Sequence, residues 1–166
     1  MELPAPVVKA ITESRPGAQI GAVEAENEAG IILYDIELAS EAGEMEVAED
    51  GTVMEISTTV EMKDVPKAAA DAILAAAASA NINELERCEV RAEVREVAGK
   101  GTVTKLATPR EVYEAEMVKG DQRAEVEVDR SGVVIEAPKW HAQAAQLTPV
   151  PTTVLAMPRG YQLHRP

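Results

Sequence analysis

The chain has 166 residues and a mass of 17.7 kDa, and its 29 acidic residues outnumber its 16 basic residues to give a formal net charge of −13. A chain this acidic is poorly suited to bind nucleic acid, because neutralising phosphates requires clustered Lys and Arg. A membrane span is not expected either, since the most apolar stretch, residues 68–80, is shorter than the roughly 20 residues that a spanning helix needs. Hydrophobic residues make up 46% of the chain, which is enough for a folded core.

The charges divide the chain into three parts. Residues 1–62 carry a net charge of −12 and residues 63–137 carry −4, whereas residues 138–166 carry +3 and contain no acidic residue. The last part is also rich in proline, so it is chemically distinct from the rest of the chain. We interpret it as a basic C-terminal arm.

The first two parts share short motifs in the same order, which predicts two tandem repeats. Leu3-Pro4 and Ala18-Gln19-Ile20 recur 62 positions later as Val65-Pro66 and Ala80-Asn81-Ile82. Later matches are 79 to 81 positions apart. This change of spacing places an insertion near residues 87–111 of the second copy, where a loop tolerates extra residues.

Each copy opens with a pattern typical of an amphipathic helix, with a proline at its first turn and apolar residues at spacings of three and four. Pro16-Gly17 should end the first helix, whereas the second is expected to run to about Ser79. The expected buried positions are Val7, Ala10, Ile11, Ala69, Ala70, Ile73, Leu74 and Ala77.

After each helix the apolar period changes to two, which predicts strands separated by Gly-containing turns. In the first copy the strand-like runs are 20–28, 31–39, 43–49 and 52–60, and in the second they are 84–97, 103–107, 111–118, 122–129 and 132–137. The sequence therefore predicts an α+β fold of two tandem repeats, each with one helix packed on an antiparallel four-stranded β-meander.

Alternation along the strands predicts that one sheet face packs against the helices and the other presents carboxylates. Tyr34 and Tyr113 are expected on the core side. Three interpretations of the acidic rows stay open: a solvated face, a face that binds a protein partner with a basic surface, and a weak calcium site. The candidate partner-binding residues are Asp35, Glu37, Glu44, Glu46, Glu55, Glu114, Glu116, Glu125 and Glu127.

The residue types that carry catalysis or bind metals do not form a recognisable pattern. His141 and His164 are the only histidines, and with the single Cys88 they do not have the spacing of a zinc site. Cys88 has no histidine near it in sequence and there is no Gly-x-Ser-x-Gly motif, so a nucleophilic enzyme is not expected. We predict a packed or half-exposed strand cysteine, no catalytic residue, no resident metal and no cofactor.

Several short motifs resemble PepSY-like domains of the β-lactamase-inhibitor type. Pro16-Gly17-Ala18-Gln19-Ile20 resembles the break after that family's opening helix, and Tyr34-Asp35-Ile36-Glu37-Leu38 is similar to one of its strands. Asp50-Gly51-Thr52-Val53 is similar to its closing hairpin. The second copy departs from the pattern, since Ala78-Ser79 replaces Pro-Gly and the insertion splits two strands. The resemblance implies an exported bacterial protein, periplasmic or extracellular, whose modules bind another protein without catalysis and could act like an inhibitor.

The N-terminus carries no export-signal pattern, so an exported protein would have had its signal peptide removed. Two functional hypotheses follow. In the first, the acidic sheet faces bind a basic protein surface. In the second, the C-terminal arm docks on a neighbouring copy by strand addition and builds a homo-oligomer or filament. The candidate docking residues of the arm are Trp140, Val154, Leu155 and Met157, although such a segment stays disordered unless it docks.

Overall fold

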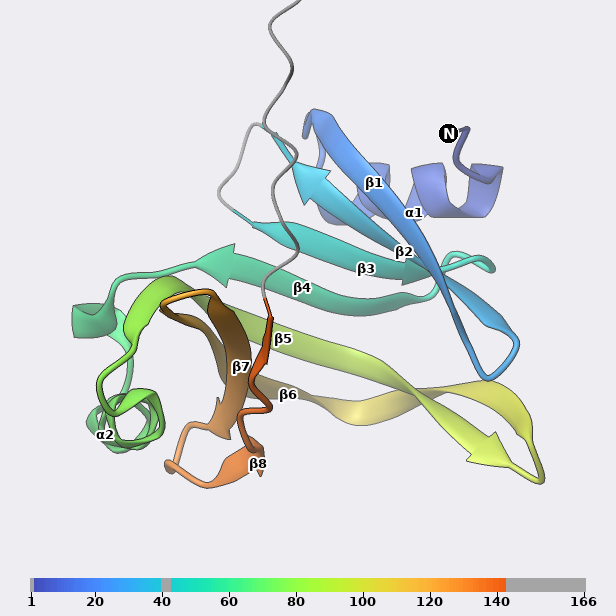
Figure 1. Ribbon diagram of the computed structural model, residues 1–166. Helices are drawn as coiled ribbons and strands as arrows, with labels where there is room; N and C mark the ends of the chain where they lie inside the picture. Colours follow the sequence, from blue (N-terminus) through green and yellow to red (C-terminus); the bar gives the residue numbers. More distant parts are fainter. Residues whose placement is uncertain (1, 40–42, 143–166) are drawn as a thin grey trace, which may run out of the picture.

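The computed structural model describes residues 2–39 and 43–142, which contain two short α-helices and nine β-strands (Figure 1). The helices are α1 (Ala5–Ser14) and α2 (Lys67–Ala77), and a 3-10 turn at Met62–Asp64 precedes α2. The strands are β1 (Ile20–Glu28), β2 (Ile31–Leu38), β3 (Glu44–Ala48), β4 (Val53–Thr59), β5 (Asn81–Val97), β6 (Lys100–Lys119), β7 (Gln122–Asp129), β8 (Val134–Glu136) and β9 (His141–Ala142). Neither helix has the length and apolar character needed to cross a membrane, and the described residues contain no other candidate.

All nine strands belong to one antiparallel sheet, in which β1 to β8 follow chain order and β9 pairs with β7. The decisive contact joins β4 to β5, where Glu55 is opposite Val90 and Thr59 is opposite Glu86. The predicted fold class is therefore wrong, because the chain forms one mostly β structure and not an α+β pair of helix-backed four-stranded meanders. A sequence repeat indicates the strands within each copy, but it does not reveal which strand edges meet. Pairing β4 with β5 satisfies backbone groups that two separate meanders would leave on exposed edges.

Both helices begin at a proline and bury one face, as their apolar spacing predicts. Val7, Ala10 and Ile11 of α1 are buried, and Ala69, Ile73 and Ala77 of α2 are buried. The helix α2 ends at Ala77, where Ala78 adopts a φ of 50° and its backbone N–H donates to the carbonyl of Leu74. Leu74 itself is 52% exposed, so its predicted place in the core is wrong.

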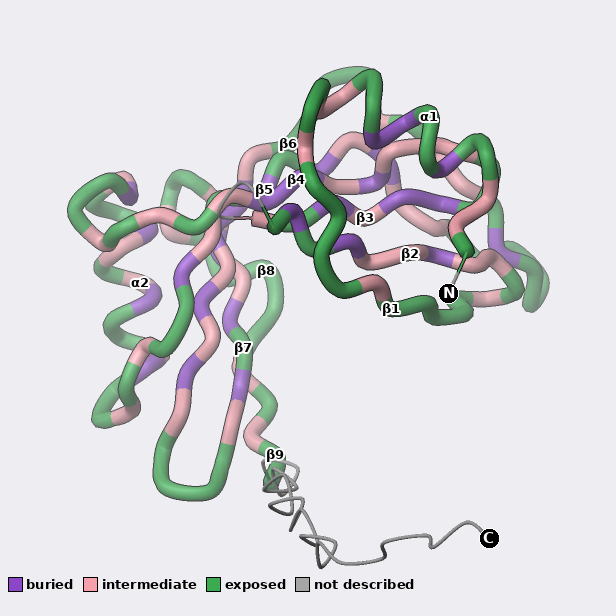
Figure 2. The backbone as a smooth tube through the Cα atoms, turned by 90° about the horizontal axis from the view of Figure 1, so that it is seen from above, coloured by how far each residue is buried: buried purple, intermediate pink, exposed green. Residues whose placement is uncertain are grey.

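Two hydrophobic clusters lie between the helices and the sheet. One joins α1 to β2, β3 and β4 around Ile36, Met45 and Val47, and the other joins α2 to β5, β6 and β7 around Met117 and Val126. All five residues are buried, and Figure 2 shows buried stretches on the strands beside each helix. Tyr113 is buried in the second cluster and the half-buried Tyr34 packs against the first, as expected. Since Ile56 and Leu85 lie on the same side of the β4–β5 pair, both helices cover one face of the sheet.

The insertion predicted near residues 87–111 is not a separate set of strands, because it lengthens the β5–β6 hairpin. The register shifts where Val90 is opposite Arg110 but Ala92 is opposite Lys105, so β6 bulges at this point. At the tip, the Gly101 N–H donates to the Ala29 carbonyl at 2.8 Å. A Cβ at residue 101 would lie 2.8 Å from that oxygen, so the close approach requires glycine.

Candidate functional site

Carboxylates line up across neighbouring strands on the face of the sheet opposite the helices, which we call the acidic face. In the first half, Glu24 of β1 is opposite Asp35, Asp35 is opposite Glu46 of β3, and Glu46 is opposite Glu55 of β4. Directly opposed residues point to the same side of a sheet. The four side chains therefore form one row from β1 to β4.

The second half repeats the arrangement with its own rows. The longer row contains Glu86 of β5, Glu114 of β6, Glu127 of β7 and Glu136 of β8. A shorter row contains Glu84, Glu116 and Glu125. Because β4 pairs with β5, the rows of both halves lie on the same face of one continuous sheet.

The two halves together enclose a hollow of about 520 Å³ on this face. Its lining contains nine carboxylates, and Arg123 is the one basic side chain among the described residues that line it. Arg123 contacts Glu116 at 2.6 Å and Glu125 at 3.0 Å. The nine acidic residues are Glu24, Asp35, Glu37, Glu44, Glu84, Glu86, Glu114, Glu116 and Glu125.

A smaller hollow of about 210 Å³ lies at the junction of the halves, where β2 to β6 contribute to its lining. Asp35 and Glu46 line it from the first half and Glu114 lines it from the second. The Ser57 hydroxyl of β4 donates to the Glu86 carboxylate of β5 at 2.9 Å, which links the halves directly. We call Asp35, Glu46 and Glu114 the centre of the acidic face.

Burial and mutual repulsion change how the central carboxyls titrate. Burial, together with the nearby Glu125 and Glu55, raises the pKa of Glu114 from its ordinary value of 4.5 to about 8. Burial and neighbouring carboxylates likewise raise the pKa of Glu46 to about 7 and that of Asp35 to about 6. Near neutral pH, Glu114 is therefore mostly protonated and Glu46 is about half protonated, whereas Asp35 is mostly ionised. A cation that approaches them would favour the charged form and release protons.

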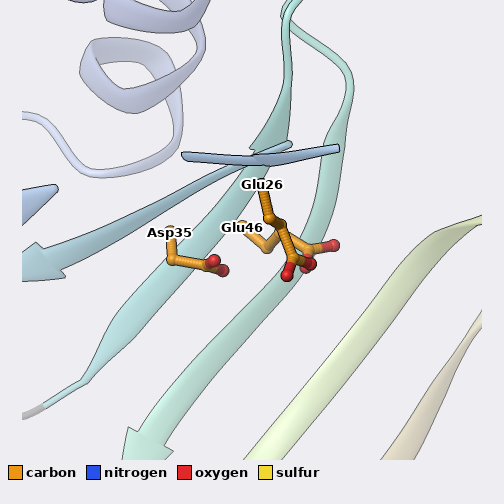
Figure 3. Close-up of side chains that lie close together, drawn as sticks. All are labelled: Glu26, Asp35 and Glu46. Carbon is orange, nitrogen blue, oxygen red and sulfur yellow. The ribbon is translucent and has the colours of Figure 1, made fainter. Parts of the chain in front are cut away.

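The carboxylate oxygens of Glu26, Asp35 and Glu46 lie within 4.8 Å of one another (Figure 3). Among the described residues, this is the one cluster in which three acidic side chains lie close enough together to hold a single cation. Oxygen ligands suit calcium, yet a tight calcium site uses six to eight of them in a dedicated loop. Protons compete for the same oxygens because the pKa values of Asp35 and Glu46 are raised.

Cys88 is a buried strand residue, as predicted, and lies on the same side of the sheet as Ser57. Burial raises the pKa of its thiol, and the adjacent Glu55 carboxylate raises it further. A thiol held in its neutral form is a weak nucleophile. His141 is exposed in β9, and His164 lies outside the described residues.

The sequence matches no protein-family model and no curated protein. Solved structures do resemble it. A protein described as "putative periplasmic" from Bacteroides eggerthii aligns with a TM-score of 0.57 at 11% identity, over 84% of this chain and 90% of that chain. A DUF2874 family protein from Bacteroides ovatus aligns with a TM-score of 0.53 at 12% identity, over 94% and 99%. A BLIP-like protein from Bacteroides fragilis aligns with a TM-score of 0.52 at 10% identity, over 87% and 90%.

The chain has a BLIP-like fold. Identities this low carry the fold and nothing further, so the resemblance to tandem PepSY-like domains and the division at residues 62 and 137 stay predictions. The BLIP-like sheet brings together all nine acidic residues that the sequence nominated. Asp35, Glu37, Glu44, Glu114, Glu116 and Glu125 line the larger hollow, Glu46 and Glu55 line the smaller one, and Glu127 belongs to the row through Glu114.

The candidate residues did not include Glu24 and Glu26 of β1 or Glu84 and Glu86 of β5, which also lie on this face. A signal for them was present, because each alternates with an apolar or small residue in the same way as the nominated acids. Of the nominated arm residues, Trp140 packs against the cluster under α2. Val154, Leu155 and Met157 lie outside the described residues.

Proposed function

We propose that the protein is an exported, non-catalytic recognition module that uses its acidic face to bind a protein partner with a basic surface. The observation that supports this most directly is the hollow lined by nine carboxylates from both halves of the sheet. A merely solvated face would not need to gather so many like charges into one concavity, where repulsion costs stability. A cationic partner would relieve this repulsion when it binds, and this relief makes the free energy of binding more favourable.

The names of two structural neighbours support the exported location and the protein-binding role in this proposal. One structural neighbour carries a periplasmic description and another is named BLIP-like. Together with the resemblance to PepSY-like domains, these names favour an exported module that binds proteins, and we include an inhibitor-like role in the proposal. Electrostatic contacts of this kind mainly speed association and select the partner.

The test measures binding of a fluorescent oligolysine peptide at low and high salt. We expect saturable binding that weakens steeply with salt, because the Debye length falls from about 30 Å at 0.01 M to about 8 Å at 0.15 M. The variant Glu44→Lys/Glu84→Lys should reduce affinity at low salt at least about tenfold, since reversing two charges at the hollow replaces attraction with repulsion. Both side chains are exposed and one comes from each half, so the fold should tolerate the change.

The matched control is Glu2→Lys/Glu13→Lys, which changes the net charge equally at exposed positions in and just before α1. This variant should retain most of the affinity, because it leaves the acidic face intact. Equal losses in the two variants would mean that the peptide responds to net charge alone. That result, or affinity independent of salt, would contradict the proposal.

A further inference from the structure

The face of the sheet that carries the helices holds a groove that the proposed function does not use. Its larger part, about 740 Å³, lies between α1, the β3–β4 turn and the bulge of β6. A smaller part, about 450 Å³, continues over β4 and β5 beyond the end of α1. Arg91 and Pro109 line both parts, so these adjoin as one elongated hollow, which we call the helix-side groove.

The backbone fixes two walls of the helix-side groove. In the β3–β4 turn, Gly51 has a φ of 88° and approaches the start of α1 so closely that a Cβ would lie 2.8 Å from the Pro6 carbonyl oxygen. Leu106 and Pro109 belong to the bulge of β6 and form part of another wall. The groove is therefore shaped by the fold, and part of its lining is apolar.

The charges in this groove have a different balance from those on the acidic face. In the larger hollow there, nine carboxylates face a single described basic residue. The helix-side groove has five basic and four acidic lining residues, although acidic residues outnumber basic ones by 29 to 16 in the whole chain. The basic residues are Lys9, Arg15, Arg87, Arg91 and Lys105, and the acidic ones are Glu13, Asp50, Glu89 and Glu111.

The acidic groups of the groove already have partners within the protein. Asp50 accepts a hydrogen bond from the Thr52 N–H at 2.8 Å. By contrast, Arg87 and Lys105 are exposed and form no salt bridge within the part of the chain that the structure describes. These two cations are therefore available to carboxylates of another molecule. The remaining acids are paired as Glu13 with Lys9 at 3.8 Å, Glu89 with Arg91 at 2.6 Å and Glu111 with Arg130 at 3.2 Å.

We propose that the helix-side groove binds an extended, acidic segment of a second protein, with carboxylates at Arg87 and Lys105 and apolar side chains against Val53 and Leu106. Charge complementarity selects an acidic segment, since the unpaired groups are cations. The length of the groove, which passes from α1 across β5, suits an extended segment. This surface lies on the opposite side of the sheet from the acidic face, so a protein that uses both connects an acidic partner with a basic one.

The primary experiment locates binding directly on the full-length, isotope-enriched protein. The probe is a peptide in which glutamate and leucine alternate, added at about 0.15 M salt, where a Debye length of about 8 Å screens repulsion from the distant acidic face. Backbone amide signals of Ala10, Arg87 and Lys105 should shift until the protein is saturated. The signals of Glu84 and Glu116 on the acidic face should stay in place.

Charge-reversal variants test whether the two unpaired cations hold the peptide. Arg87→Glu/Lys105→Glu should lower the affinity at least about tenfold, because two attractive contacts become repulsive. The matched control, Lys100→Glu/Lys119→Glu, makes the same change of net charge at exposed ends of β6 that do not line the groove. It should change the affinity at most about twofold, since distant exposed charges are screened.

Each outcome of these measurements decides for or against the groove. Shifts confined to its lining, with a loss of affinity in the groove variant alone, support the assignment. Shifts centred elsewhere, equal losses in the two variants, or no saturable binding would overturn it. The spectra of the unmodified chain place the peptide even if a variant fails to fold. Binding of oligolysine does not enter these outcomes, so this inference and the proposed function fail separately.

Discussion

The centre and the rim of the acidic face contain the same kind of residue in different electrostatic surroundings. At the rim, Arg123 lies between Glu116 and Glu125 and contacts both carboxylates. At the centre, Asp35, Glu46 and Glu114 form no salt bridge within the described residues, and their pKa values are raised. A fixed arginine thus stabilises charged carboxylates at the rim, whereas bound protons reduce the repulsion at the centre. A cation that binds would therefore have its most favourable electrostatic interaction at the centre.

The pH dependence of stability is the largest expected sign of this difference. Because the folded-state pKa values at the centre lie above the ordinary values, their favourable contribution is complete below about pH 4 and is lost as pH rises through about 6, 7 and 8. We expect the free energy of unfolding to fall by roughly 2 to 4 kcal/mol between pH 4.5 and 8.5, after allowance for solvent screening. Urea unfolding at a series of pH values measures this. Stability that rises over the interval would contradict the assigned repulsion.

The alternation of the strands predicted much of this face correctly. Asp35 and Glu37 alternate with Tyr34, Ile36 and Leu38, and this period of two placed the acids opposite the helices. The same reasoning applied to β6 and β7, where the acidic residues alternate with buried ones. Side-chain direction in a strand is a local property, so a single sequence contains the information.

The joining of the two halves could not be predicted in this way, because it depends on which strand edges meet. Thr59 and Glu86 are directly opposed although a helix separates them in the chain. The repeat suggested two closed units, and nothing local distinguishes an edge that pairs with the next unit from one that faces solvent. The hollow needs this contact, since its lining comes from both halves.

The apolar corner of the acidic face was also missed. Leu33, Ala48 and Met54 lie on this side and pack with Ala92 of the long β5–β6 hairpin. Leu33 is in phase with Asp35, so alternation alone assigns it to a polar face. The insertion explains the exception, because the hairpin covers that corner and excludes water from it. The sequence analysis treated the insertion as a loop that tolerates extra residues, so it did not predict that the insertion packs against this corner.

Removing one central charge should make the centre resemble the rim. Glu114→Gln keeps the shape of the side chain but cannot ionise, so at pH 8.5 it should raise the free energy of unfolding by roughly 1 to 2 kcal/mol. The matched variant Glu116→Gln should bring no gain, since it removes a carboxylate that Arg123 contacts. Urea unfolding at pH 8.5 and 4.5 distinguishes them, because the advantage of Glu114→Gln should vanish at the lower pH. A gain that persists at pH 4.5 would point to packing and not to charge.

Removing the arginine should have the smallest effect and should make the rim resemble the centre. Arg123 is 42% exposed at its side chain, and exposed ion pairs contribute little. We therefore expect Arg123→Gln to lower the free energy of unfolding by only about 0.5 to 1 kcal/mol at neutral pH, because Glu116 and Glu125 lose their shared cation. Urea unfolding at neutral pH measures this loss. If Arg123→Gln leaves the free energy of unfolding unchanged, the arginine does not separate the rim from the centre, and the difference must come from burial alone.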